Sequence, residues 1–149
     1  LLASACAVGA WSGSENQEIT EKLRQFGEWT GIAFQIKDDL FDYGTDAIGK
    51  PTGNDIKEKK LTLPLIYTLN NINAAKRREL IYILKNQNRI KERVNYVIAQ
   101  VRQAGGIQYG IGKMNEYREK ALTLLREFPP SETRMALEEL VNYTTDRKH

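Results

Sequence analysis

The longest uninterrupted helical pattern in the chain runs from Ser14, a typical N-cap residue with Gln17 at the capping-box position, to about Tyr43. Successive residues of a helix lie about 100° apart, and the apolar residues of this segment then cover roughly 200° of its circumference. That arc is much wider than the single stripe of a surface helix. The pattern therefore predicts a central helix that is packed on most of its sides.

The remaining arc of this helix is polar near its C-terminal end. It carries four polar side chains, those of Gln35, Asp38, Asp39 and Asp42. Gly27 and Gly31 lie in the turns before them. Small residues above an acidic cluster predict an open groove with room for a bulky ligand.

The rest of the chain is also helical by pattern. Gly44 to Lys57 contains three Gly and one Pro, which predicts a loop. The first ten residues resemble the tail of a buried helix. Further helices are expected from near Leu63-Pro64, at about Ala74 to Lys85, at about Arg89 to Gln103 with a stripe of Ile90, Val94, Val97 and Val101, from Met114 to Phe128, and after Ser131. No strand-like alternation competes with these patterns, so the fold class is all-α, and residues 1–149 fit a single domain.

Composition excludes several classes of function. Hydrophobic residues make up 41% and charged residues 28% of the chain, and the net charge is only +3. No basic run is long enough for a nucleic-acid stripe, so no nucleic-acid partner is expected. The single Cys6 excludes an internal disulfide and favours a cytoplasmic location, and the single histidine is the terminal His149. The opening apolar run is too short to cross a bilayer, so no transmembrane segment is expected.

The three aspartates suggest a cation site. Asp38 and Asp42 are four residues apart and point the same way from a helix, and Asp39 flanks them. Three like charges this close repel each other unless a cation lies between them. Oxygen ligands without His or Cys favour Mg²⁺, with Mn²⁺ as the alternative. A solvated acidic helix end is the competing interpretation, and the glycines and the lysine-bearing loop that follows weigh against it.

Lysines follow the acidic cluster and suit diphosphate oxygens that a metal does not reach. Lys50 and Lys60 are the candidates for this role. Lys57 and Lys59 are instead expected to be solvated loop residues. Gln35 lies one turn before the aspartates, where its amide would face a reacting centre. No Ser/His/Asp or Cys/His arrangement supports nucleophilic hydrolysis.

The segment that contains these aspartates and lysines resembles a known family. The run Phe34-Gln-Ile-Lys-Asp-Asp-Leu-Phe-Asp42, followed by Gly49-Lys50, Gly53-Asn-Asp55 and Lys60-Leu-Thr-Leu-Pro64, is similar to the second aspartate-rich region of trans-polyprenyl diphosphate synthases. The resemblance implies a helical bundle that forms the C-terminal portion of the isoprenoid synthase (terpenoid synthase) fold. It implies a prenyltransferase that condenses an allylic diphosphate with isopentenyl diphosphate, with Mg²⁺ as cofactor.

The resemblance also implies residue roles. Asp38 would be the principal metal ligand, with Asp39 and Asp42 as direct or water-mediated partners. Lys50 would bind the allylic diphosphate, and Lys60 would hold the loop and its phosphate side together with Asp55. Gln35 would direct its amide oxygen at the developing carbocation. At the C-terminus, Arg147 and Lys148 fit a frayed tail better than a diphosphate site.

The chain departs from the family pattern in one respect. Nothing before Asp38 resembles the first aspartate-rich motif. The chain is therefore expected to be the C-terminal half of a synthase, inactive by itself, and the resemblance implies a homodimer for the intact enzyme. Two alternatives stay open, a non-catalytic helical subunit of a two-component prenyl synthase and a class I terpene cyclase.

Overall fold

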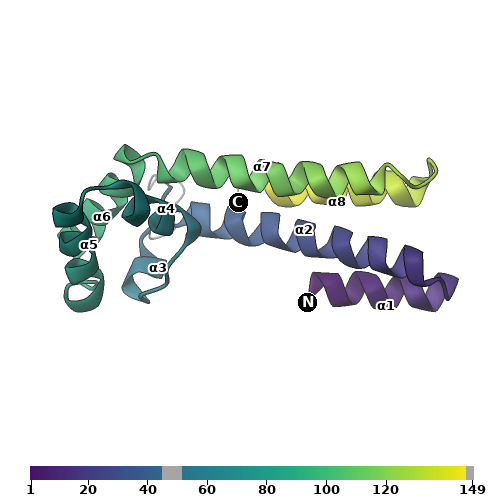
Figure 1. Ribbon diagram of the computed structural model, residues 1–149, viewed down its shortest axis with the longest axis horizontal. Helices are drawn as coiled ribbons and strands as arrows, with labels where there is room; N and C mark the ends of the chain where they lie inside the picture. Colours follow the sequence, from purple (N-terminus) through teal and green to yellow (C-terminus); the bar gives the residue numbers. More distant parts are fainter. Residues whose placement is uncertain (45–51, 147–149) are drawn as a thin grey trace. The chain divides into compact units, whose positions relative to one another are not determined.

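The computed structural model describes residues 1–44 and 52–146, and every element within those ranges is an α-helix. The helices are drawn in Figure 1. Their bounds are α1 Leu2–Ser14, α2 Gln17–Phe41, α3 Asn54–Lys57, α4 Leu63–Asn71, α5 Ala74–Asn86, α6 Lys91–Gln103, α7 Gly106–Leu125 and α8 Glu132–Asp146. The all-α prediction is confirmed. Within the same ranges, no helix is long and apolar enough to cross a membrane.

The start of α2 differs from the prediction. Ser14 is the last residue of α1, and its hydroxyl donates a hydrogen bond to the Ala10 carbonyl in its own helix. Asn16 caps α2 instead, because its side-chain oxygen accepts the backbone N–H groups of Glu18 and Ile19 at 2.9 and 3.1 Å. The helix α1 therefore continues to Ser14, and the cap of α2 lies two residues later than the pattern predicts.

Most other boundaries agree with the pattern to within a few residues. Pro64 lies in the first turn of α4, and the Ser131 hydroxyl oxygen accepts the N–H of Arg134 to cap α8. The segment Gly44 to Lys57 is not loop throughout, since its last four residues form α3. One turn of helix is too short to produce a periodic pattern, and α3 owes its start to a side chain from outside the segment, as described below.

The helices divide into two compact units. One comprises Leu1–Gln35 and Lys113–His149, and the other comprises Ile36–Gly112. The helices α2 and α7 contribute to both units. The prediction of a single domain stays a prediction.

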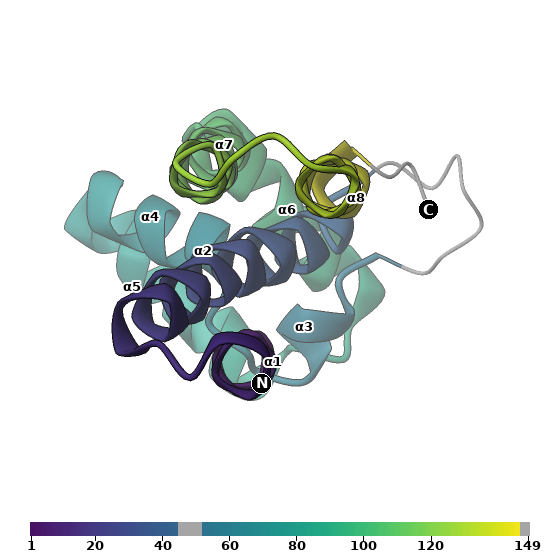
Figure 2. The ribbon, with the colours of Figure 1, turned by 90° about the vertical axis from the view of Figure 1, so that its right-hand side faces the viewer.

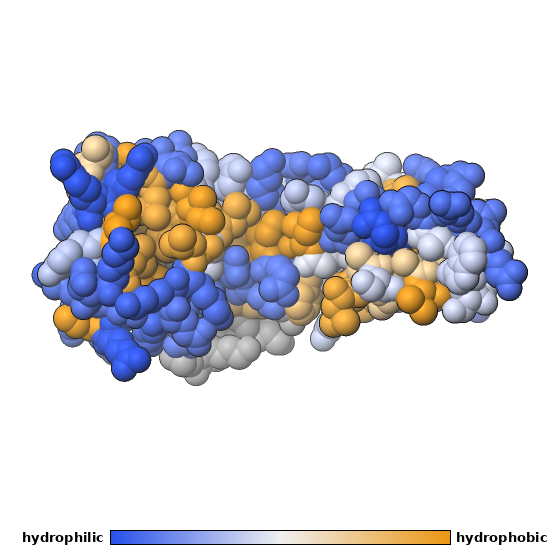
Figure 3. All heavy atoms as spheres, turned by 60° about the horizontal axis from the view of Figure 1, so that its bottom comes forward, coloured by the Kyte–Doolittle hydropathy of each residue, from blue (hydrophilic) through white to orange (hydrophobic). Residues whose placement is uncertain are grey.

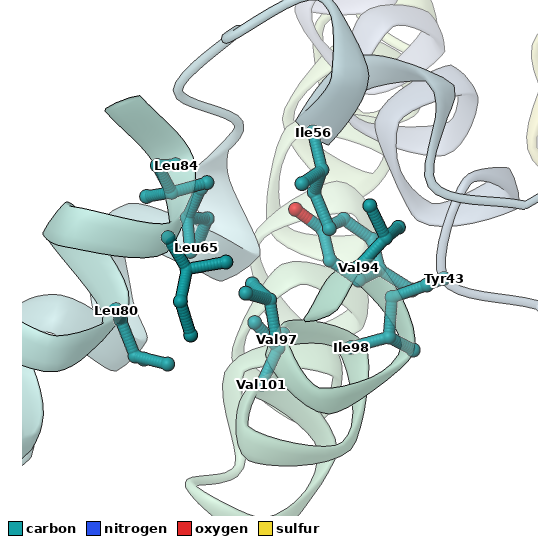
Figure 4. Packing of buried hydrophobic residues seen from close by; sticks show 10 residues of the cluster. Tyr43, Ile56, Leu65, Leu80, Leu84, Val94, Val97, Ile98 and Val101 are labelled. Carbon is teal, nitrogen blue, oxygen red and sulfur yellow. The ribbon is translucent and has the colours of Figure 1, made fainter. Parts of the chain in front are cut away.

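The unit Ile36–Gly112 has a core built from α4, α5, α6, α3 and the end of α2. Figure 4 shows these side chains converging between the helices. The predicted stripe of α6 is confirmed for three members, Val94, Val97 and Val101, each at most 2% exposed. Its fourth member, Ile90, is 46% exposed because it occupies the N-cap position ahead of the helix. The core thus holds α6 beside the segment that follows the aspartates.

The other unit is built around the first part of α2. In Figure 2, α1 lies on one side of α2, and α7 and α8 lie on the other. The core of this unit consists of Phe26 from α2, Ala121, Leu122 and Leu125 from α7, and Val141 from α8. The wide apolar arc of α2 therefore meets neighbours on two sides, as predicted.

The expected groove above the aspartates is occupied beside Gly27. A Cβ atom at this position would lie 2.6 Å from the Leu2 carbonyl oxygen and 2.8 Å from the Cys6 sulfur. Gly27 therefore lets α1 approach α2 closely, and the interpretation of an open face at this turn is wrong. Gly31, one turn on, has ordinary contact room against Leu2, at 3.5 Å.

The opening helix is not buried, which corrects a second expectation. Ala10 is the buried residue of α1, whereas Val8 is 65% and Trp11 is 52% exposed. Figure 3 shows apolar side chains on the surface where α1 lies. Small residues such as alanine and glycine give α1 high average apolarity without a one-sided pattern, so sequence alone does not indicate which side is covered.

We expect Gly53→Ala to destabilise the chain. Gly53 has a φ of +77°, and a Cβ atom there would lie 2.3 Å from the Val94 side chain. The unfavourable backbone and the overpacking together should lower the free energy of unfolding by about 2 to 4 kcal/mol, measured by chemical denaturation.

Gly112→Ala is the matched control. This helical glycine has nothing within 4 Å of its added Cβ atom. Helix propensity should raise the free energy of unfolding by about 0.5 to 1 kcal/mol. Equal effects of the two substitutions would contradict the close packing at Gly53.

Candidate functional site

The three aspartates lie at the C-terminal end of α2, all partly buried. Asp38 and Asp39 are in its last turns, and Asp42 directly follows its last residue, Phe41. In residues 1–44 and 52–146, no three His, Cys, Asp or Glu side chains are gathered as a metal-binding group. The sequence therefore places the three carboxylates on one helix end, but they do not converge on one point.

Asp42 is engaged by the backbone of α3. Its two carboxylate oxygens accept the N–H groups of Asn54 and Asp55 at 2.8 and 3.0 Å, and its carbonyl oxygen accepts the N–H of Gly53 at 3.0 Å. The first N–H groups of a helix have no partner within the helix, so Asp42 caps α3 from outside. We call these three bonds the Asp42 anchor. It joins the two ends of the segment that contains residues 45–51.

Asp39 is bound to the next helix. The backbone N–H of Leu63, at the start of α4, donates a hydrogen bond to its carboxylate. Burial nevertheless raises the pKa of Asp39, and the charges of Asp55 and Asp38 raise it further. Asp39 therefore lies in an environment that disfavours its negative charge.

The same balance holds at Asp42. Burial raises the pKa of its carboxyl group and outweighs the two backbone N–H bonds, which lower it. The charge of Asp55 adds to the increase. A cation beside these carboxylates would remove the imbalance, because an opposite charge favours the ionised form.

Lys60 is held by acidic neighbours. Its ammonium group lies 2.8 Å from Glu58 and 3.2 Å from Asp55, and its side chain is 60% exposed. The hydrogen bond to Glu58, followed by that to Asp55, raises the pKa of Lys60, so it stays charged. Its backbone N–H also donates to the Asp55 carbonyl, at 2.8 Å. Lys60 is thus tied to Asp55, and its contact with a diphosphate stays a prediction.

The other lysines have different positions. Lys57 is exposed and donates to the side chain of Asn54 at 3.3 Å, as expected for a surface residue. Lys59 donates to the Lys85 carbonyl at 2.9 Å, so it links this segment to α5. Lys50 lies outside the described residues, as do Arg147 and Lys148. Gln35 is exposed on α2.

Sequence reasoning missed three residues that fix the end of α2. Tyr43 is 2% exposed, and its hydroxyl hydrogen-bonds that of Thr62. Arg102, from α6, donates to the carbonyl oxygens of Tyr43 and Gly44 at 2.7 and 2.8 Å. Tyr43 follows the acidic cluster directly, which was a signal for its importance. Arg102 is separated from Tyr43 by 59 positions, and no local pattern indicates the contact.

Comparison with known proteins defines the class. The family model described as polyprenyl synthetase matches residues 1–101. The chain therefore belongs to the polyprenyl synthetase family.

A curated relative is heptaprenyl diphosphate synthase component 2 of Bacillus subtilis, which is 28% identical over 99% of this chain and 42% of its own length. The chain thus spans less than half of that relative.

Solved structures of prenyl diphosphate synthases share the fold of this chain. Geranylgeranyl pyrophosphate synthase from Bacteroides thetaiotaomicron is 36% identical with a TM-score of 0.89, over 98% of this chain and 48% of its own. The polyprenyl synthase from Caulobacter crescentus, solved in complex with calcium and isoprenyl diphosphate, is 28% identical with a TM-score of 0.86, over 99% of this chain and 46% of its own. The fold is that of the all-α isoprenoid synthases, as the resemblance implied.

We expect Asp42→Ala to destabilise the chain, since two backbone N–H groups of α3 lose their acceptor. The expected loss in unfolding free energy is about 1 to 2 kcal/mol. Asp42→Asn also removes the charge but retains one acceptor oxygen, so its loss should be smaller. Chemical denaturation measures both, and an alanine variant as stable as the wild type would refute the anchor.

We expect Tyr43 to make stability depend on alkaline pH. Burial raises the pKa of its hydroxyl above the ordinary value of 10.0. The folded state therefore binds this proton more tightly than the unfolded state does. Its contribution to stability is complete below the unfolded pKa and is lost as pH rises through the folded pKa.

Tyr43→Phe removes this titration. At neutral pH the variant should be less stable than the wild type by about 1 to 2 kcal/mol, because the Thr62 hydroxyl loses its partner. The difference should shrink or reverse between about pH 9 and about pH 11 in denaturation experiments. A difference that is constant with pH would contradict the prediction.

Proposed function

We propose that this chain supplies the second aspartate-rich half-site of a trans-polyprenyl diphosphate synthase. In the intact enzyme, the site would bind the diphosphate of an allylic substrate through Mg²⁺ for condensation with isopentenyl diphosphate. The observation that carries the proposal is the end of α2, where three partly buried aspartates lie within five residues in a chain of this family. Burial, which raises the pKa of Asp39 and of Asp42, supports it.

The donor set fits a magnesium ion. Three carboxylates and no histidine or cysteine favour a hard cation, with Mn²⁺ as a substitute. Mg²⁺ commonly takes one or two protein carboxylates and completes its shell with water and substrate phosphates. A magnesium site therefore does not require three converging carboxylates. The Caulobacter crescentus relative, with its calcium and isoprenyl diphosphate, supports divalent-metal use.

The proposal gives each aspartate a different role. Asp38 is the principal ligand in this proposal, and Asp39 assists from beside α4. Both carboxylate oxygens of Asp42 already accept N–H groups, so Asp42 acts through the position of α3 or through a water. Lys60 is paired with Glu58 and Asp55 and keeps the loop in place, which leaves Lys50 as the lysine proposed to bind the diphosphate.

The chain's residues would then promote loss of diphosphate. Bound Mg²⁺ supplies positive charge that stabilises the leaving diphosphate. Gln35, one turn earlier on α2, would direct its amide oxygen at the allylic carbocation, a preorganised dipole aimed at developing charge. The double bond of isopentenyl diphosphate would add to the allylic carbocation and form the new carbon–carbon bond. The cation that results would lose a proton and regain a double bond.

Binding of diphosphate is the first test. Titration calorimetry with inorganic pyrophosphate should detect binding with Mg²⁺ and none with EDTA. Asp38→Asn should weaken binding at least about tenfold, in line with the loss of a charged ligand. Asp146→Asn, an exposed aspartate of α8 paired with Arg118, is the control and should bind as the wild type does. Equal binding by both variants would refute the role of Asp38.

Turnover is the second test. The matched relatives are about twice as long as this chain, and positioning by both halves of a clamp supplies much of the rate. We therefore expect no product from allylic diphosphate, isopentenyl diphosphate and Mg²⁺ with this chain alone. Radiolabelled isopentenyl diphosphate would detect product, and a rate comparable to that of a full-length relative would overturn this expectation. A homodimer is proposed for the intact enzyme.

One observation favours a second candidate. The Bacillus subtilis relative is named as one component of a heptaprenyl diphosphate synthase, which suggests assembly from more than one kind of chain. A supporting, non-catalytic subunit would have no need of a diphosphate site. Pyrophosphate binding that depends on Asp38 would exclude this candidate, and its absence would favour it.

A further inference from the structure

The end of α2 is supported by a residue from a distant part of the chain. Arg102, near the C-terminal end of α6, donates from one guanidinium nitrogen to the carbonyl oxygens of Tyr43 and Gly44. These carbonyl groups lie two and three residues past Phe41, the last residue of α2. A cation at a helix C-terminus also interacts favourably with the helix dipole. Arg102 therefore holds the chain at the point where it leaves α2.

The same side of α6 supports the other end of the segment. Val94, Ile98 and Arg102 are four residues apart, so they form one stripe along the helix. Val94 and Ile98 lie against Gly53, where an added Cβ atom would come within 2.3 and 3.3 Å of them. Figure 4 shows Tyr43 beside Val94 and Ile98 in the core.

The two stretches of chain that the Asp42 anchor joins, at Tyr43 and at Gly53, thus both contact this stripe of α6. Tyr43 follows the aspartate that accepts the anchor bonds, and Gly53 is the first residue that donates them. The apolar part of the stripe fixes their distance from α6. Arg102 adds directional bonds, which fix where the backbone turns after Asp42.

We propose that Arg102 is a positioning residue for the aspartate-rich site, acting through the backbone of Tyr43 and Gly44 and not through contact with a ligand. It holds the last turn of α2 in register with α3, so that the carboxylates of Asp39 and Asp42 keep their places. The inference rests on the proposed function for its effect on ligand binding. Its effect on the anchor is independent of that function.

Hydrogen exchange of the full chain without ligand tests the anchor. Five amides report on this region: those of Gly53, Asn54 and Asp55, which form the anchor, and those of Tyr43 and Gly44, which bond to the last turn of α2. In Arg102→Gln they should exchange about tenfold faster, as expected for loss of charge-assisted hydrogen bonds. Amides of α5 in the same core should be unchanged. Arg102→Lys keeps a charged donor and should restore part of the protection.

Arg93→Gln is the matched control, because Arg93 is also an exposed arginine of α6 and the substitution changes the charge equally. It should leave the five amides as they are in the wild type. Unchanged exchange in Arg102→Gln would overturn the proposal, and so would acceleration spread evenly over the core, which would indicate general destabilisation.

Pyrophosphate binding with Mg²⁺ tests the consequence for the site. Arg102→Gln should weaken binding about three- to tenfold, with Arg102→Lys in between and Arg93→Gln unchanged. Faster exchange at the anchor with undiminished binding would overturn the positioning role. If the wild type binds no pyrophosphate, the proposed function fails, and the hydrogen-exchange result still decides whether Arg102 supports the anchor.

Discussion

The arrangement of the candidate site depends on one carboxylate that binds the backbone at the start of another helix. Asp42 accepts two N–H groups of α3 while its carbonyl accepts a third, so the chain that leaves α2 returns to it within a short distance. The short helix α3 has little stability of its own, since a single turn gains few internal hydrogen bonds. Its place is set by this aspartate and by the core beneath Ile56.

Charge crowding at the end of α2 has a physical cost that the fold only partly offsets. Asp39 and Asp42 receive N–H bonds from α4 and α3, yet burial still disfavours their ionised forms. Lys60 supplies positive charge to Asp55 and Glu58 at the exposed edge of the same segment. The remaining imbalance is the property that a divalent cation would relieve, which connects the electrostatics to the proposed function.

Much of the fold could be predicted from periodicity, and the exceptions have local causes. The stripe of Val94, Val97 and Val101 indicated the buried face of α6, because each turn of a helix repeats the pattern. The role of Gly27 was misread, since a missing side chain gives room either to a ligand or to another helix, and α1 occupies it. The spacing of Asp38, Asp39 and Asp42, the lysine loop after them and the family resemblance predict a metal site at the end of α2. No sequence pattern indicates Arg102, since its contact with Tyr43 joins distant elements.

The stripe of α6 has a consequence for how much chain the site requires. Every side chain proposed to touch metal or substrate lies between Gln35 and Lys60, so these residues form a nearly continuous cassette in the sequence. Their scaffold extends to Arg102. Moving this segment alone into another helical protein would transfer the proposed ligands without the α6 side chains that position them. The shape of the site therefore depends on the whole stretch from the end of α2 to the end of α6.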